Sequence, residues 1–226
     1  MKITDNINRL GTETAFKVLA EAKKLEKEGK EIIHLSLGQP DFKTPGHIVD
    51  ATIKALNEGH HGYVLPNGTI ECREAVSRKI NNLYNVDVNP EKIIIMPGGK
   101  PTMYYAITLF GEPGAEIIYP DPGFPIYESM INYTGAKAVP INMLENKDFS
   151  INPEKILSLI NNNTRLIILN NPNNPTGSFT EKNKIDELVS GLKKFPKVTI
   201  LSDEIYSRLI FDDKEMPTFF NYPDLY

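Results

Sequence analysis

The chain has 226 residues, with 25 Lys and Arg against 29 Asp and Glu, so its formal net charge is −4. Hydrophobic residues make up 40% and charged residues 24%, the balance of an ordinary globular protein. The mild, interspersed acidity gives no basic patch for nucleic acid or for a membrane surface. A single cysteine excludes an internal disulfide and a thiolate metal cage. Because no stretch resembles a secretory signal or a membrane span, we expect a cytoplasmic protein.

The first 44 residues predict a helix followed by a short strand. We interpret the charged stretch 21–30 as the solvated face of a helix that Gly29 ends. Residues 31–37 are predicted to form the strand, which leads into a loop at 38–41. The predicted buried face of the helix consists of Ala15, Phe16, Leu19, Ala22 and Leu25.

From Pro45 onward, helical and strand patterns alternate. Helices are predicted at 45–58, 69–81, 101–110, 126–132 and 153–161, and from a Thr180 cap to 195. Strands are predicted at 92–96, 116–119, 136–141, 165–169 and 198–201. Apolar, unalternating strands separated by helices predict an α/β fold with a mainly parallel sheet covered on both faces.

Unusual residues follow several of these strands, in the loops 98–100, 121–125, 170–177 and 203–206. Ligands of parallel sheets bind at the carboxyl ends of the strands, so these loops predict a ligand site. The Gly-Gly-Lys at 98–100 opens a helix, where backbone N–H groups favour a phosphate, although a simple tight turn is the alternative. It lacks the spacing of a Walker or Rossmann motif.

The other candidates each have a plain structural interpretation. The Asn- and Pro-rich loop 170–177 is either a rigid turn or a rigid support that aims the amide of Asn174. Asp203 is either a solvent-exposed cap or a buried carboxylate that requires a cationic partner. His34 and the histidines at 60–61 lack metal-ligand spacing, and we interpret Cys72 as a small packing residue on a helix.

Two motifs together resemble those of the class I and II aminotransferases, pyridoxal-phosphate enzymes with the aspartate aminotransferase fold. They are Asn-Pro-Asn-Asn-Pro-Thr-Gly at 171–177 and Ser-Asp-Glu-Ile-Tyr at 202–206. The segments 11–16, 38–42, 62–63, 98–100 and 121–125 also occur in the family's order. The resemblance covers essentially the whole chain. It implies fold type I, with an N-terminal arm and the start of the small domain at 1–44 and an incomplete large domain at 45–226.

The resemblance implies a role toward pyridoxal 5′-phosphate for each matching residue. Asp203 matches the carboxylate that keeps the pyridine nitrogen protonated. Asn174 and Tyr206 match the residues that hydrogen-bond the phenolic oxygen, and Phe124 matches the aromatic ring that stacks on the pyridine. The matching phosphate cradle consists of Gly98, Gly99 and Lys100, through the amides of the last two.

Further matches concern the substrate and a second subunit. Tyr63 matches a tyrosine that reaches the phosphate across a dimer interface, which implies a homodimer. Gly38 and Asn174 match positions beside the substrate α-carboxylate, and Lys100 matches a position that offers an ammonium to an acidic substrate. The implied reaction moves an amino group between an amino acid and a 2-oxo acid through the pyridoxamine form of the coenzyme.

The family's Schiff-base lysine has no match. It lies in a Ser/Thr-x-Ser-Lys segment after the Asp-Glu-x-Tyr motif, and nothing up to Tyr226 fits, because Lys214 sits in an acidic turn without the serines. The family's phosphate-binding and carboxylate-binding arginines are missing too. We therefore expect a fragment whose lysine lies beyond Tyr226, with most of the cradle and no catalysis of its own. The aromatic residues after 218 are expected to stay exposed.

Two alternatives stay open. A carbon–sulfur lyase of the same fold usually carries His where this chain has Tyr206, which favours transamination. The second alternative is a non-catalytic protein that binds the coenzyme or dimerises with a full-length partner. Reading the DNA past the codon for Tyr226 separates the fragment from this last alternative, because only the fragment predicts an open frame with Ser-x-Ser-Lys.

Overall fold

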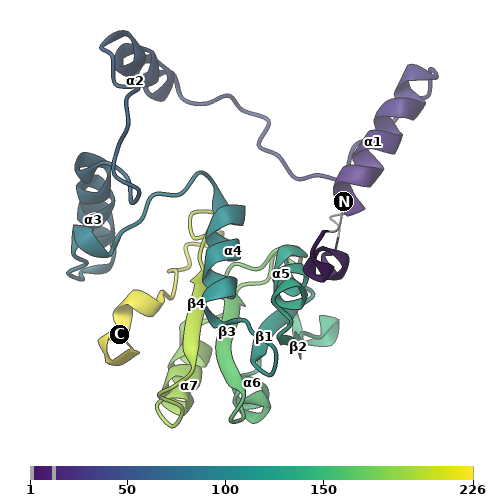
Figure 1. The fold of residues 1–226 in the computed structure, drawn as a ribbon, viewed down its shortest axis with the longest axis vertical. Coiled ribbons are helices and arrows are strands. Elements are labelled where there is room, and N and C mark those ends of the chain that lie inside the picture. Colours follow the sequence, from purple (N-terminus) through teal and green to yellow (C-terminus); the bar gives the residue numbers. More distant parts are fainter. Residues whose placement is uncertain (1–2, 12–13, 226) are drawn as a thin grey trace.

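The computed structural model describes residues 3–11 and 14–225 and contains a four-stranded sheet (Figure 1). The strand order is β2-β1-β3-β4, and each neighbouring pair is parallel. The strands are β1 (Glu116–Asp121), β2 (Lys137–Asn142), β3 (Thr164–Asn170) and β4 (Thr199–Asp203). The predicted α/β fold with a parallel sheet is confirmed.

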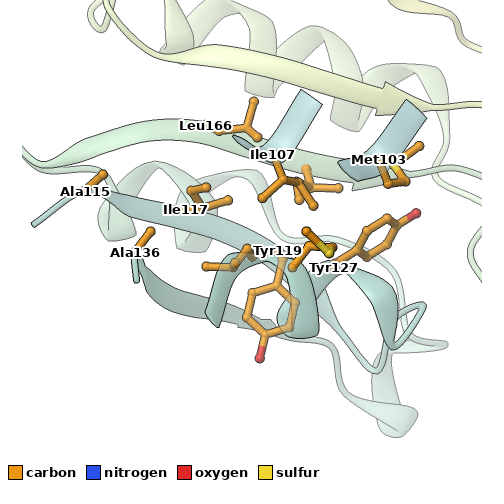
Figure 2. Packing of buried hydrophobic residues seen from close by; sticks show 11 residues of the cluster. Met103, Ile107, Ala115, Ile117, Tyr119, Tyr127, Ala136 and Leu166 are labelled. Carbon is orange, nitrogen blue, oxygen red and sulfur yellow. The ribbon is translucent and has the colours of Figure 1, made fainter. Parts of the chain in front are cut away.

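Helices cover both faces of this sheet. On one face, α4 (Gly99–Phe110) and α5 (Ile126–Thr134) pack against Ile117 of β1, as Figure 2 shows. On the other face, α6 (Pro153–Leu159) and α7 (Lys182–Leu192) share a cluster with Ile118. Both isoleucines are fully buried, although they point to opposite faces. Burial on both faces explains why these strands do not alternate apolar and polar residues.

The N-terminal arm is fastened to the end of α5. It contains the short helix η1 (Asp5–Arg9). The Arg9 guanidinium donates to the main-chain carbonyls of Asn132 and Tyr133, each at 2.8 Å. A cation at the last carbonyls of a helix satisfies unpaired acceptors and interacts favourably with the helix dipole. The arm therefore docks on the sheet unit before the chain leaves it.

Three helices follow outside the sheet unit. They are α1 (Thr14–Lys27), α2 (Gly46–Asn57) and α3 (Ile70–Tyr84), and extended segments join them in Figure 1. No residue of α1 is fully buried, but Ala15, Leu19, Ala22 and Leu25 of the predicted buried face are half-buried, and only Phe16 of that face is exposed. Cys72 on α3 is exposed rather than packed. Thr12 and Glu13 of the 11–16 motif, and Tyr226, lie outside the described residues.

Two predicted strands do not form. Residues 31–37 are extended with Ile33 exposed, and residues 92–96 follow the short helix η2 (Pro90–Lys92) without a strand. A strand needs a neighbour for its N–H and C=O groups, and neither segment forms a strand ladder in the described residues, although the Ile95 N–H donates to the Asn67 carbonyl at 3.1 Å. Apolar β-branched sequence alone does not supply that neighbour. The division of the chain at residue 45 stays a prediction.

Two other predictions change at the ends of helices. The helix expected from Pro101 already begins at Gly99. Thr180 does not cap α7, whose N-cap is Glu181. Instead the Thr180 N–H donates to Asn171 Oδ1 at 2.8 Å, which ties this residue to the 170–177 loop.

The C-terminal aromatic residues are packed, contrary to the prediction. Residues 218–225, here called the C-terminal strap, contain η4 (Phe219–Asn221) and η5 (Pro223–Leu225). Phe219, Tyr222 and Leu225 contact the apolar cluster under α7. The Tyr222 hydroxyl donates to Asp186 Oδ1 at 2.6 Å, so the strap is also held by a polar contact.

Candidate functional site

The site begins where β3 and β4 end side by side. Asn170 and Asp203, the last residues of these strands, are register partners. Asn170 Nδ2 donates to the main-chain oxygen of Asp203 at 3.0 Å, and its Oδ1 accepts the Asn174 N–H at 2.7 Å. One side chain thereby fixes the loop that carries Asn174 onto the end of β4.

The predicted polar residues meet at this point. Asn174 Nδ2 donates to the Tyr206 hydroxyl oxygen at 3.1 Å. Tyr206 lies in the turn after β4, and that turn is closed by the Ile205 N–H, which donates to Asp203 Oδ1 at 3.2 Å. The structure therefore brings together Asn174, Asp203 and Tyr206, which come from two different loops.

Asp203 has a partner that the sequence did not predict. The hydroxyl of Tyr127 on α5 donates to Asp203 Oδ2 at 2.5 Å. Burial and the charge of Asp203 raise the pKa of Tyr127, so its hydroxyl keeps its proton and acts as a donor. Asp203 is half-buried and forms no ion pair with any described side chain. The carboxylate thus keeps acceptor capacity that a protonated ring nitrogen would use.

Phe124 lies beside this tyrosine. Its ring meets the Tyr127 ring edge-on, with centroids 5.8 Å apart and planes at 83°. The loop that carries Phe124 turns tightly at Gly123, where an added Cβ would overlap the main-chain oxygen of Pro120. Glycine at this position therefore permits the loop that places an aromatic ring near Asp203.

The start of α4 is open around its glycines. Gly98 has φ +101°, and a Cβ on Gly98 or Gly99 would meet nothing within 4 Å. Backbone donors at an open helix start suit the oxygens of a phosphate. Met103, one turn later, packs in the same cluster as Tyr127 (Figure 2). The cluster therefore connects this helix start to the side chain that holds Asp203.

Some predicted residues do not reach this group. Lys100 Nζ lies 5.1 Å from the centre of the Phe16 ring of α1. Tyr63 is 108% exposed between α2 and α3, and Gly38 lies exposed in the segment before α2. Lys214 forms an ion pair with Glu181 at 2.8 Å, away from the strand ends. In the described chain the Lys100 ammonium, Tyr63 and Gly38 are therefore not brought into the Asp203 group, and Lys214, for which no site role was predicted, is paired with Glu181.

Sequence reasoning missed Tyr127, Asn170 and Glu204. Glu204 is half-buried, and this burial raises the pKa of its carboxyl although hydrogen bonds from Ser202 and Thr218 oppose the shift. The available signals were weak: a tyrosine inside an apolar helix and an asparagine ending a strand, each of which needs a partner when buried. Within residues 3–11 and 14–225, no group of three His, Cys, Asp or Glu is placed to hold a metal ion.

Comparison with known proteins accounts for this arrangement. Residues 30–225 match the family model described as aminotransferase class I and II. The chain belongs to this family. It is 32% identical to the aspartate aminotransferase of Bacillus subtilis over 95% of this chain and 54% of that protein. It is 37% identical to a probable aspartate aminotransferase of Methanocaldococcus jannaschii over 81% of this chain and 48% of that protein.

Solved structures of the family share the fold. The aspartate aminotransferase from Thermus thermophilus with maleate has a TM-score of 0.90 at 29% identity, over 96% of this chain and 56% of that chain. An alanine aminotransferase from Pyrococcus furiosus has a TM-score of 0.87 at 27% identity, over 95% of this chain and 55% of that chain. The chain spans about half the length of these aminotransferases.

Proposed function

We propose that this chain carries the coenzyme cradle of an aminotransferase that exchanges an amino group between an amino acid and a 2-oxo acid. The observation that supports it most is the convergence of Asp203, Asn174 and Tyr206 at the ends of β3 and β4. Family membership supports the same reaction class. Because relatives are named aspartate aminotransferases, aspartate is the first amino donor to test.

The proposed coenzyme is pyridoxal 5′-phosphate, and the residues present fit it. When bound, it supplies an electron sink for negative charge that develops at the substrate α-carbon. Asp203 would accept a hydrogen bond from the protonated ring nitrogen. The Tyr127 hydroxyl holds the Asp203 carboxylate in place through its hydrogen bond to Oδ2. The Asp203 carboxylate, which has no ion-pair partner among the described side chains, and the open helix start at Gly99 are the structural features that this coenzyme would occupy.

The remaining cradle residues bind the coenzyme and orient its ring. Asn174 and Tyr206 direct polar hydrogens toward the phenolic oxygen of the ring, and Phe124 covers one ring face. The phosphate is held by the helix start at Gly98, Gly99 and Lys100. Orientation by fixed donors matters because they need no rearrangement when charge develops.

Substrate and subunit roles belong to the same proposal. Gly38 and Asn174 lie beside the substrate α-carboxylate, and Lys100 faces an acidic substrate side chain. A homodimer in the cytoplasm is proposed, in which Tyr63 of one copy reaches the phosphate of the other. The complete exposure of Tyr63, in the segment between α2 and α3, supports a role outside its own subunit. Among the described residues, no helix combines the length and the apolar character that crossing a bilayer requires.

The binding part of the proposal is tested with pyridoxamine 5′-phosphate, which lacks the aldehyde that reacts with surface lysines. Isothermal titration calorimetry compares it with pyridoxamine on the 226-residue chain. We expect the phosphate to tighten binding by at least about tenfold, because the helix start pairs with it. Equal affinities, or no binding by the folded chain, would overturn the proposed cradle.

The reaction part is tested with aspartate and 2-oxoglutarate. We expect no oxaloacetate from this chain alone, because it has no lysine in a Ser-x-Ser-Lys segment. A protein in which this chain continues into such a segment is expected to form oxaloacetate. Pyruvate and thiol from cystathionine would instead support the carbon–sulfur lyase, and binding without either reaction in that longer protein would support a non-catalytic role.

A further inference from the structure

Glu204 is a second carboxylate beside Asp203, and the cradle described above does not use it. We propose that Glu204 is a positioning residue that fastens the C-terminal strap to the turn carrying Asp203 and Tyr206, and thereby keeps the coenzyme site in shape. This inference rests on the proposed function, because its readout is coenzyme binding. It assigns to the strap a role in the site as well as in packing.

The contacts of Glu204 join the turn to the strap. Its Oε1 accepts the Ser202 hydroxyl at 2.9 Å, the Thr218 hydroxyl at 3.2 Å and the Phe219 N–H at 3.4 Å. Thr218 is fully buried, and its Oγ1 accepts the Phe220 N–H at 3.3 Å. The first turn of the strap is therefore built around this carboxylate.

The surroundings of Glu204 make its carboxylate dependent on the hydrogen bonds from the strap. No described cationic side chain forms an ion pair with Glu204, and the charge of the neighbouring Asp203 opposes its ionisation. A half-buried carboxylate without an ion-pair partner is unfavourable unless hydrogen bonds compensate. Here the compensation comes from the three donors, two of which belong to the strap. Detaching the strap thus removes most of what stabilises the carboxylate.

The strap is anchored at its other end independently of the site. Tyr222 donates to Asp186 of α7, and Asp224 pairs with Lys193 at 2.8 Å. Phe220 also stacks on Tyr84 of α3, with ring centroids 5.8 Å apart. The strap therefore stays on α7 when Glu204 is changed, and only its connection to the Asp203 turn is lost.

Release at Glu204 affects the coenzyme residues through the backbone. The Ser207 N–H donates to the Glu204 carbonyl at 2.9 Å, and the Leu209 N–H donates to the Tyr206 carbonyl at 2.8 Å. These turns lie between Asp203 and an exposed segment that includes Leu209 and Phe211. When Glu204 no longer binds the strap, the turns lose this attachment after β4. Tyr206 then loses its alignment with Asn174.

The test compares Glu204→Ala, Glu204→Gln and Thr218→Val with Asp186→Ala, a control that removes the acceptor of the Tyr222 hydroxyl and so loosens the far end of the strap. Pyridoxamine 5′-phosphate affinity, the near-ultraviolet circular dichroism of the bound coenzyme and the melting temperature are measured for each chain. We expect Glu204→Ala to weaken affinity about tenfold and to change the dichroism, since a hydrogen-bonded charged group is removed. Glu204→Gln keeps an acceptor oxygen and is expected to stay within about threefold of the wild type.

Two results separate a positioning role from a structural one. Thr218→Val is expected to weaken affinity in the same direction as Glu204→Ala, whereas Asp186→Ala lowers the melting temperature and leaves affinity unchanged. Wild-type affinity in Glu204→Ala and Thr218→Val, or equal weakening in Asp186→Ala, would overturn the inference. A folded wild-type chain that does not bind the coenzyme would instead overturn the proposed function itself.

Discussion

Tyr127 places a buried hydroxyl against the carboxylate that defines the site. Its side chain has no exposed surface, and the bond to Asp203 is its polar anchor in an apolar cluster. Motifs located Asp203, Asn174 and Tyr206 because each lies in a short contiguous segment. Tyr127 is 76 residues from Asp203 in the chain, and only the folded sheet brings the two together. Long-range pairs of this kind are the part of the site that sequence could not predict.

Tyr127→Phe tests this bond directly. Removing the hydroxyl takes away the side-chain donor to Asp203 Oδ2 and leaves only the Ile205 N–H on Oδ1, so we expect a loss of about 1.5–3 kcal/mol in the free energy of unfolding. Weaker binding of pyridoxamine 5′-phosphate is expected as well, and urea denaturation and calorimetry measure the two effects. Tyr133→Phe is the matched control, because the Tyr133 hydroxyl makes no hydrogen bond to the described residues. Equal stability of the two variants would contradict the assignment.

Gly123→Ala tests the tight turn before Phe124. The added methyl would overlap the Pro120 carbonyl, and backbone cannot move away as a flexible side chain can. We expect a loss of about 1–3 kcal/mol in stability and a displaced Phe124 ring. Gly46→Ala at the start of α2, where nothing lies within 4 Å, is expected to be neutral or slightly stabilising. A stable Gly123→Ala chain with unchanged near-ultraviolet dichroism would refute this explanation.

At the scale of elements, apolar runs made all four strands predictable, and in the central strands β1 and β3 these runs reflect burial on both faces. Continuous apolar runs bounded by turns indicated these strands and the helices between them. The same signal at 31–37 and 92–96 predicted strands, and these segments join no sheet in the described chain. An apolar run predicts that a segment is buried, but it does not predict which other segment packs against it.

The turn after β4 has a predictable response to pH. Burial raises the pKa of the Glu204 carboxyl above its ordinary 4.5, and the charge of Asp203 adds to this. The folded chain therefore binds this proton more tightly than the unfolded chain, so stability falls as pH rises from below 4.5 through the raised pKa. We expect this loss in the wild type and not in Glu204→Gln, by urea denaturation across that range. A difference between the two chains that does not vary with pH would contradict the raised pKa.

At the scale of the whole molecule, apolar surface outside the sheet unit stands without a partner. On α2 the exposed apolar side chains are Ile48, Val49, Ile53 and Leu56. The helix has no buried residue in the described chain, and Figure 1 shows it away from the sheet. Apolar faces of this kind mark surfaces that associate. They agree with the proposed homodimer, in which Tyr63 just after α2 serves another copy.

The α2 face is tested with the double variant Ile53→Lys, Leu56→Lys. Sedimentation at about 0.1 mM is expected to show association of the wild type, because burying this face removes apolar area from water. The double variant is expected to shift toward monomer, and Lys54→Ala on the same helix is not. A wild type that stays monomeric at that concentration would exclude this face as the interface.

The central claim is that the ends of β3 and β4 and the start of α4 form one coenzyme cradle. A crystal structure of the 226-residue chain grown with pyridoxamine 5′-phosphate tests it most directly. We predict the ring nitrogen within hydrogen-bond distance of Asp203, and the phosphate on the amides of Gly99 and Lys100. A ligand bound elsewhere, or one that leaves Asp203 without a contact, would contradict the claim.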